Sequence, residues 1–222
     1  MTYTAVIFDL DGTLVNSLED LADSANEMLT AQGYPTHSVP EYKYFVGNGS
    51  RKLIERILPE DQRSEANLNA CLEIYKNIYA RHQLNKTYAY AGMPQVVQTL
   101  KARGLKLAVC TNKHVSAATV VLEALYGKGT FTHLVADRPG TNFKRKPDPT
   151  NVLKLAAELG VTPAQVAYVG DSSVDMETAT RAGFLPVGCL WGFRTQEELL
   201  QSGAQILLTT PAELLTKVPL VK

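Results

Sequence analysis

The sequence has few cysteines and no long apolar run. Its 222 residues include three cysteines, Cys71, Cys110 and Cys189, which lie far apart and show no C-x-x-C spacing. This odd, dispersed set argues against a disulfide framework or a zinc site and favours a reducing compartment. No apolar stretch approaches the ~18 residues that cross a bilayer, and no basic segment precedes an apolar one near the first residue. We therefore expect a cytoplasmic protein without a membrane partner.

An excess of charge of either sign is also absent. Lys and Arg together number 22, as do Asp and Glu, so the formal net charge is zero. Such a chain has no global field to attract nucleic acid, and a small-molecule partner is favoured. The four histidines show no metal-ligand spacing, so we assign none of them to catalysis.

The first third of the chain has the apolar spacing of helices. Ser17, with Asp20 three positions later, resembles a capping box, and apolar residues then recur at helical spacing until Gly33. Similar patterns cover residues 49–58 and 68–82. Residues 16–83 are therefore expected to be all-helical.

The pattern changes after Tyr90 to short β-prone runs that alternate with helical ones. The β-prone runs cover residues 105–110, 133–136, 166–169, 185–190 and 206–208, and the helical patterns cover 94–102, 115–125, 150–159 and 175–182. Alternation of this kind predicts a parallel sheet built from right-handed βαβ units.

One further β-prone run, Ala5-Val6-Ile7-Phe8, stands before the helical segment. The simplest topology adds this strand to the later sheet. The predicted fold class is thus α/β, with a Rossmann-like parallel sheet core formed by residues 1–15 plus 84–222. Residues 16–83 would be an all-helical cap domain inserted after the first strand.

Acidic residues follow the ends of two predicted strands. Asp9 and Asp11 come after the first strand and Asp171 after a later one, while Thr111 follows the strand that ends at Cys110. Ligands of open α/β sheets bind beyond the carboxyl ends of the strands, so these segments can converge. One carboxylate can attack phosphorus while a second protonates the leaving oxygen. We assign Asp9 as the nucleophile and Asp11 as the acid/base.

An anionic nucleophile that approaches a phosphate needs positive charge nearby. Mg²⁺ is the obvious cofactor, because it prefers oxygen ligands, which Asp9 and Asp171 could supply with the Asp11 carbonyl. Thr111 and Asn112 can donate hydrogen bonds to phosphate oxygens, and Lys146 can contact both the nucleophile and the transferred group. Singly, each segment reads as a turn or a helix cap; their conjunction favours a phosphoryl-transfer site.

These four segments resemble the motifs of the haloacid dehalogenase superfamily. They read Asp9-Leu10-Asp11-Gly12-Thr13-Leu14-Val15, Thr111-Asn112-Lys113, Lys146-Pro147-Asp148-Pro149 and Gly170-Asp171-Ser172-Ser173-Val174-Asp175. The resemblance spans nearly the whole chain and implies a phosphoric monoester hydrolase of the subgroup with a helical cap.

Within the superfamily the chain is most similar to the phosphoglycolate phosphatases, through Val46-Gly47-Asn48-Gly49, the Thr-Asn-Lys motif and Trp191-Gly192-Phe193-Arg194. This resemblance implies hydrolysis of 2-phosphoglycolate to glycolate, with Asp9, Asp11 and Asp171 around Mg²⁺ and Asp175 as a supporting acid. It also implies that Lys113, Asn48 and Arg51 contact the substrate.

The sequence departs from that pattern at Asn16, where an acid is common, and at His114, which replaces a frequent proline. Alternative functions are therefore a pyrophosphatase, a nucleotide or sugar-phosphate phosphatase, or a mutase similar to β-phosphoglucomutase. Outside this class stands a phosphoaspartate signalling module. The sequence is compatible with a monomer or a dimer.

Overall fold

The computed structural model describes residues 2–221. Six parallel strands form one sheet in the order β5-β4-β1-β6-β7-β8. Their bounds are β1 Ala5–Phe8, β4 Lys106–His114, β5 His133–Asp137, β6 Val166–Gly170, β7 Leu185–Cys189 and β8 Ile206–Leu208. The predicted Rossmann-like parallel sheet, joined by the N-terminal strand, is confirmed.

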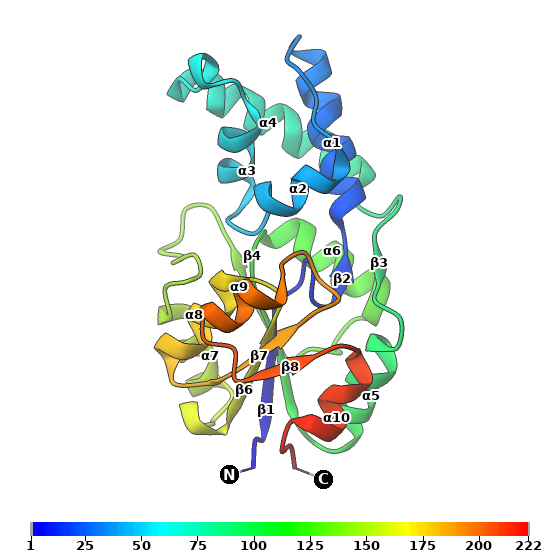
Figure 1. Ribbon diagram of the computed structural model, residues 1–222, viewed down its shortest axis with the longest axis vertical. Helices are drawn as coiled ribbons and strands as arrows, with labels where there is room; N and C mark the ends of the chain where they lie inside the picture. Colours follow the sequence, from blue (N-terminus) through cyan, green and yellow to red (C-terminus); the bar gives the residue numbers. More distant parts are fainter. Residues whose placement is uncertain (1, 222) are drawn as a thin grey trace.

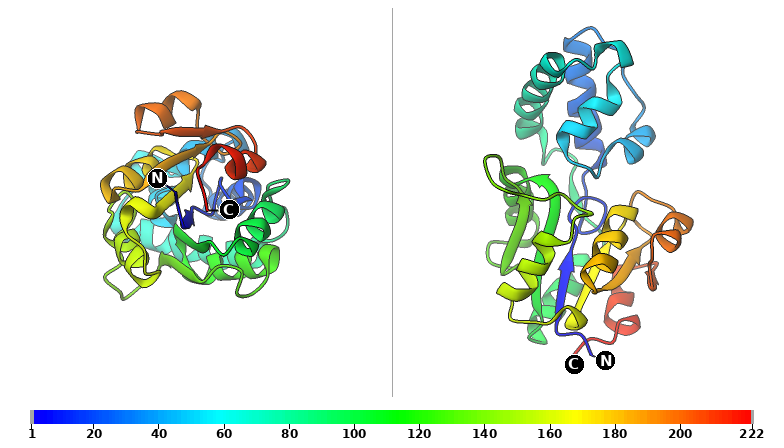
Figure 2. Two further views of the ribbon diagram at one scale, coloured as in Figure 1. Left: turned by 90° about the horizontal axis from the view of Figure 1, so that it is seen from below. Right: turned by 90° about the vertical axis from the view of Figure 1, so that its left-hand side faces the viewer.

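Helices cover both faces of the sheet (Figures 1 and 2). They are α5 Met93–Ala102, α6 Val115–Tyr126, α7 Thr150–Glu158, α8 Ser173–Ala182, α9 Gln196–Gln201 and α10 Leu214–Lys217. In β1, Val6 and Phe8 pack into an apolar cluster with α5 and α6, whereas Ala5 and Ile7 pack into another with α7 and α8. A strand buried on both faces in this way reads as a continuous apolar run.

Four helices that follow β1 in the sequence and precede the other strands of the sheet form a separate helical block. They are α1 Leu18–Ala31, α2 Val39–Phe45, α3 Ser50–Ile57 and α4 Glu65–His82. Their apolar faces share one cluster of buried side chains, which includes Met28, Tyr42, Ile54 and Tyr75. The block stands above the carboxyl ends of the strands (Figure 1).

Two short strands join the helical block to the sheet. β2 (Val15–Asn16) and β3 (Tyr88–Ala89) pair antiparallel, so the chain leaves and returns side by side. Asp20, near the start of α1, strengthens this junction by accepting hydrogen bonds from the backbone N–H groups of Lys86 and Thr87 and from the Thr87 hydroxyl. Ser17 does cap α1, but the structure gives its side chain no capping hydrogen bond. The predicted capping box is wrong, because both side chains bind residues of other segments.

The strand β4 is longer than the sequence predicts. It continues to His114, and its register against β5 shifts between Cys110 and His114. Thr111 therefore lies within β4, at the irregularity, and not beyond the strand end. The regular ladder still stops at Cys110, so the Thr111 side chain is placed at the same edge of the sheet as Asp9.

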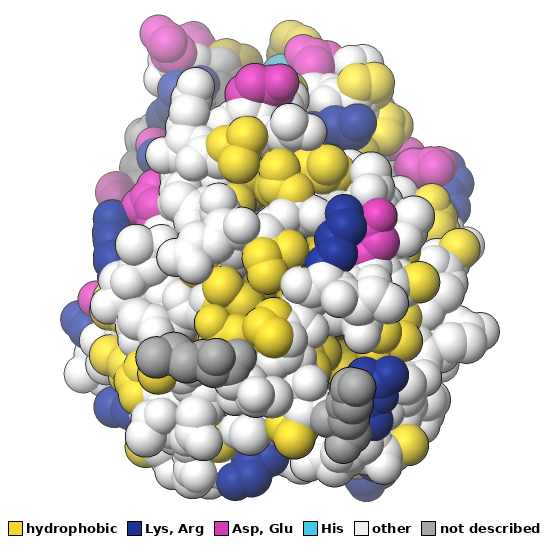
Figure 3. Space-filling model, turned by 60° about the horizontal axis from the view of Figure 1, so that its bottom comes forward, with side chains coloured by type: hydrophobic (Ala, Val, Ile, Leu, Met, Phe, Trp, Pro, Cys, Tyr) yellow, Lys and Arg dark blue, Asp and Glu magenta, His cyan; other side chains and the backbone are white. Residues whose placement is uncertain are grey.

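The face opposite the helical block carries both termini, where Tyr3 pairs with Leu220. Figure 3 shows apolar side chains in the middle of this view, with acidic and basic side chains scattered around them. Among residues 2–221, no helix is both long and apolar enough to pass through a membrane.

Candidate active site

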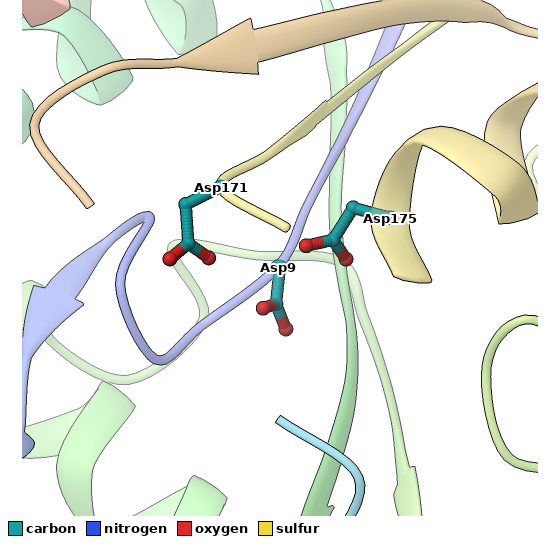
Figure 4. A group of neighbouring side chains, drawn as sticks. All are labelled: Asp9, Asp171 and Asp175. Carbon is teal, nitrogen blue, oxygen red and sulfur yellow. The ribbon is translucent and has the colours of Figure 1, made fainter. Parts of the chain in front are cut away.

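Three carboxylates converge at the carboxyl end of the sheet. Asp9 follows β1, Asp171 follows β6, and Asp175 lies in the first turn of α8. One oxygen from each lies within 4.8 Å of the others, and Figure 4 shows the three groups facing a common space. All three side chains are buried, with residue exposures of 8%, 2% and 0%. Buried like charges at this separation require a positive partner.

Lys146 supplies one such partner. Its Nζ lies 2.7 Å from an oxygen of Asp9 and 2.7 Å from an oxygen of Asp175. Burial alone would lower the pKa of Lys146, but the carboxylates of Asp175 and Asp9 hold it well above its usual range. The ammonium therefore stays charged, and it neutralises at most one of the three carboxylates.

The negative charge that Lys146 leaves uncompensated affects the pKa values of Asp9 and Asp171. Burial raises the pKa of Asp9 to about 7, against the lowering effect of Lys146. Burial, and then the charges of Asp175 and Asp9, raise the pKa of Asp171 well above its usual range. A second cation at the common space would relieve this repulsion.

Glycines allow the backbone to approach these carboxylates closely. A Cβ at Gly12 would lie 2.2 Å from Asp171, as would one at Gly192, and a Cβ at Gly170 would lie 2.2 Å from Asp175. Phe193 also donates its backbone N–H to Asp171 at 2.8 Å. Packing this tight fixes the orientation of the two carboxylates. Oriented buried carboxylate oxygens are the donor set that Mg²⁺ prefers, so the residues fit the predicted cofactor.

The two other predicted acids have different surroundings. The Asp11 side chain lies outside the cluster and accepts hydrogen bonds from Lys113 at 2.9 Å and from Ser17 at 2.5 Å, so the predicted metal contact through its backbone carbonyl stays a prediction. Asp175, expected as a supporting acid, lies in the carboxylate cluster. Asp175 also accepts from the Ser172 backbone and hydroxyl, so it caps α8 as well.

A cavity of about 400 Å³ extends from the carboxylates to the helical block. Asp9, Asp11, Thr111 and Asp171 line its lower end. Its upper wall is mostly apolar and comes from the block, through Val46, Leu53, Tyr75 and Tyr79, with Lys113 beneath the Tyr79 ring at 4.7 Å. A ligand in this cavity would touch the sheet at one end and the helices at the other.

Asn112 lines the cavity, but its amide group is occupied by the protein. It donates to the carbonyls of Gly47 and Lys146, at 3.0 and 3.3 Å, and accepts from the Lys146 N–H at 2.9 Å. These bonds tie the loop before α3 to the loop that carries Lys146. Asn112 thus holds the site together rather than offering a free amide to phosphate.

The side chains of Asn48 and Arg51 lie outside the cavity. Arg51 binds Glu65 and Asn69 at the surface, and Asn48 accepts a hydrogen bond from Arg56. Both line a neighbouring hollow of about 360 Å³. The cavity is lined at this point by Gly49 and by Ser50 and Leu53 of α3, so substrate contacts of the Asn48 and Arg51 side chains stay a prediction.

Sequence reasoning missed Thr13 and Phe193. The Thr13 hydroxyl donates to Asp171 at 3.3 Å, and Phe193 contributes the backbone N–H described above. Thr13 stands next to the acidic segment, which was a usable signal. Phe193 follows β7, and no spacing in the sequence links it to Asp171.

The carboxylate cluster predicts a pH-dependent stability in the absence of divalent cations. The pKa of Asp9 is 3.8 in its ordinary state and about 7 in the fold, so the folded protein holds this proton more tightly than the unfolded chain. The free energy of unfolding therefore falls as the pH rises through that interval. In EDTA, we expect the Tm to be several degrees lower at about pH 8 than at about pH 5.

Added Mg²⁺ should raise the Tm more at the higher pH, where fewer protons compete for the carboxylates. Differential scanning fluorimetry measures both effects, and Asp9→Asn is the control that should flatten the decline. An equal gain from Mg²⁺ at both pH values would contradict this account.

Comparisons with known proteins agree with the family resemblance of the four motifs. Residues 6–188 match the family model of haloacid dehalogenase-like hydrolases. The chain is 32% identical to a phosphoglycolate phosphatase of Psychrobacter arcticus, covering 88% of this chain and 87% of that one. It is 33% identical to a phosphoglycolate phosphatase of Aquifex aeolicus, covering 85% of each.

Solved structures agree in fold. A predicted phosphoglycolate phosphatase from Haemophilus somnus superposes with a TM-score of 0.88 at 28% identity, covering 98% of both chains. A hydrolase from Pseudomonas syringae superposes with a TM-score of 0.80 at 27% identity, covering 96% of both. With a family model that matches most of its length, and with the motif residues gathered in one site, the chain belongs to the haloacid dehalogenase-like hydrolases.

Proposed function

We propose that this protein is a Mg²⁺-dependent phosphatase that hydrolyses 2-phosphoglycolate to glycolate through an aspartyl-phosphate on Asp9. The observation that carries the proposal is the buried cluster of Asp9, Asp171 and Asp175 with Lys146 at its edge. The names of the relatives in Psychrobacter arcticus and Aquifex aeolicus support the choice of substrate.

In the proposed reaction, an oxygen of Asp9 attacks phosphorus and the bond from phosphorus to the glycolate oxygen breaks. Asp11, oriented by Lys113 and Ser17, gives its proton to the departing oxygen. Asp11 then removes a proton from water, which attacks the aspartyl-phosphate, releases inorganic phosphate and regenerates the Asp9 carboxylate.

The other residues of the site place positive charge and hydrogen-bond donors near the phosphate. Asp9, Asp171 and Asp175, with the backbone carbonyl of Asp11, would hold the cation, which when bound supplies positive charge to the phosphate oxygens. Lys146 keeps Asp9 in place through its 2.7 Å contact, and Thr111 lines the cavity where its hydroxyl can donate to the phosphate.

We further infer that residues 16–83 act as a cap domain on a core of residues 1–15 plus 84–222. Separate apolar clusters in the block and around the sheet support this division. The cavity walls come from both parts, so the cap would shield the phosphate from bulk water.

The test is phosphate release by the purified protein with Mg²⁺. We expect kcat/KM to be highest for 2-phosphoglycolate among a panel that includes sugar phosphates, nucleotides and pyrophosphate, and EDTA to abolish release. Higher kcat/KM for another ester would reject the proposed substrate while keeping the mechanism. A stable phosphoprotein without turnover would favour the signalling alternative, and isomer formation from a sugar phosphate would favour a mutase.

A further inference from the structure

The loop after β7 touches both the carboxylate cluster and the helical block. We call residues Trp191 to Arg194 of this loop the strap. The Phe193 backbone N–H donates to Asp171 at 2.8 Å, while the Phe193 side chain is buried in the apolar cluster of the helical block. One residue therefore contacts a proposed cation ligand through its backbone and the block through its ring.

Arg194 makes the second connection to the block. Its guanidinium donates to the carbonyls of Lys43 and Val46, the latter at 3.1 Å, at the end of α2. It also lies 5.4 Å from the centre of the Tyr44 ring, and its Nε is 3.5 Å from Glu198. Only 10% of the Arg194 side chain is exposed. A planar guanidinium with this many partners holds one orientation.

The other half of the strap is fixed against the core. The Trp191 indole donates to the Thr13 carbonyl at 3.0 Å. A Cβ on Gly192 would lie 2.2 Å from the Cβ of Asp171 and 2.6 Å from the Gly12 carbonyl oxygen. The core therefore holds Trp191 and Gly192 in place. A movement of Phe193 would break its hydrogen bond to Asp171.

We propose that Phe193 and Arg194 are positioning residues that couple the placement of the helical block to the orientation of Asp171. This inference rests on the proposed phosphatase function. When Arg194 holds the end of α2, the block covers the cavity and the Phe193 N–H meets Asp171. When the block moves away, the strap is pulled with it and Asp171 loses a donor.

Arg194 also lines the cavity, so the competing role is a direct contact with the carboxylate of 2-phosphoglycolate. Both terminal nitrogens of Arg194 already donate to backbone carbonyls of the block. A substrate carboxylate could engage them only by releasing those carbonyls. The two roles predict different results with a substrate that has no carboxylate.

The experiment compares Arg194→Ala with the unmodified protein on 2-phosphoglycolate and on ethyl phosphate, which has a methyl group in place of the carboxylate. A positioning role predicts a loss in kcat and in kcat/KM of about 10- to 100-fold that is the same for both esters. Arg194→Lys should recover part of the loss on both, because an ammonium can still donate to one carbonyl. Arg81→Ala, which removes an arginine that is exposed and paired with Glu27, is the matched control and should change neither.

Hydrogen exchange gives a readout that does not depend on activity. In Arg194→Ala, amides of residues 39–46 should exchange faster, while those of α5 should keep the rates of the unmodified protein. In the Arg81→Ala control, residues 39–46 should also keep those rates. If Arg194→Ala does not fold, Arg194→Lys provides the same two comparisons.

A loss confined to 2-phosphoglycolate would overturn the inference and make Arg194 a substrate ligand. Unchanged kinetics, or unchanged exchange in residues 39–46, would also overturn it. If the unmodified protein hydrolyses ethyl phosphate or 4-nitrophenyl phosphate but not 2-phosphoglycolate, the proposed substrate fails, and equal losses on the two carboxylate-free esters still support the strap.

Discussion

Replacement of Asp9 by asparagine is expected to lower kcat by on the order of 10⁴-fold or more, because an amide oxygen is a poor nucleophile toward phosphorus. The fold should persist. Asparagine has nearly the same shape, and the change removes one of three buried negative charges that repel one another. Phosphate release under saturating substrate measures the loss, and single-turnover experiments with acid quenching show whether phosphate still becomes attached to the protein.

The matched control for this substitution is Asp148→Asn. Asp148 is a carboxylate at the molecular surface, two residues beyond Lys146, where it binds the backbone N–H of Thr150. Its replacement should leave kcat within twofold. An Asp9→Asn protein that retained turnover within tenfold of the unmodified enzyme would refute Asp9 as the nucleophile and direct attention to another acid of the cluster.

Replacement of Lys146 by methionine is expected to reduce both stability and turnover. The ammonium lies 2.7 Å from two buried carboxylates, and removal of one partner from a buried ion pair costs about 3–5 kcal/mol. Denaturant unfolding at about pH 8 with EDTA should show this loss in full. With Mg²⁺ present, kcat should fall by about 10²-fold or more, as expected when a charge near the transferred group is lost.

Lys144→Met is the control for Lys146→Met, because Lys144 lies in the same loop and is exposed to solvent. It should change the free energy of unfolding by less than about 0.5 kcal/mol. The Lys146 account would be wrong if the two variants unfolded at the same denaturant concentration. A stable Lys146→Met protein with full turnover would separate the lysine from the reaction altogether.

The sequence predicts the sheet well because each strand is marked by a short apolar run of neighbouring residues. An apolar run such as Ala5–Phe8, which is buried on both faces, by itself indicates a central parallel strand. The convergence of Asp9 with Asp171 then follows from a geometric rule, since carboxyl ends of parallel strands share one edge. These inferences need no knowledge of how particular side chains pack.

The errors concern contacts between distant segments. Asp20 has the local signature of a helix cap, but Thr87 and the N–H of Lys86 lie near enough to bind it. The family resemblance places Arg51 at the substrate, whereas the structure pairs it with Glu65 and Asn69, because the rotation of α3 about its axis decides which residues face the cavity. The bond between Phe193 and Asp171 joins positions 22 residues apart, and no periodic pattern encodes it.

The paired strands β2 and β3 give the helical block a single narrow junction with the sheet, since Val15 lies opposite Ala89 and Asn16 opposite Tyr88. In evolutionary terms, whatever lies between two such neighbouring positions can be lengthened, shortened or exchanged without changing the order of the strands. If residues 16–83 act as the proposed cap, the choice of leaving group would be inherited with this insert and the chemistry with the rest of the gene. A recombination of relatives at Asn16 and Tyr88 would then transfer the choice of leaving group, and it would keep the chemistry where the new insert still offers Arg194 the two carbonyls that it contacts.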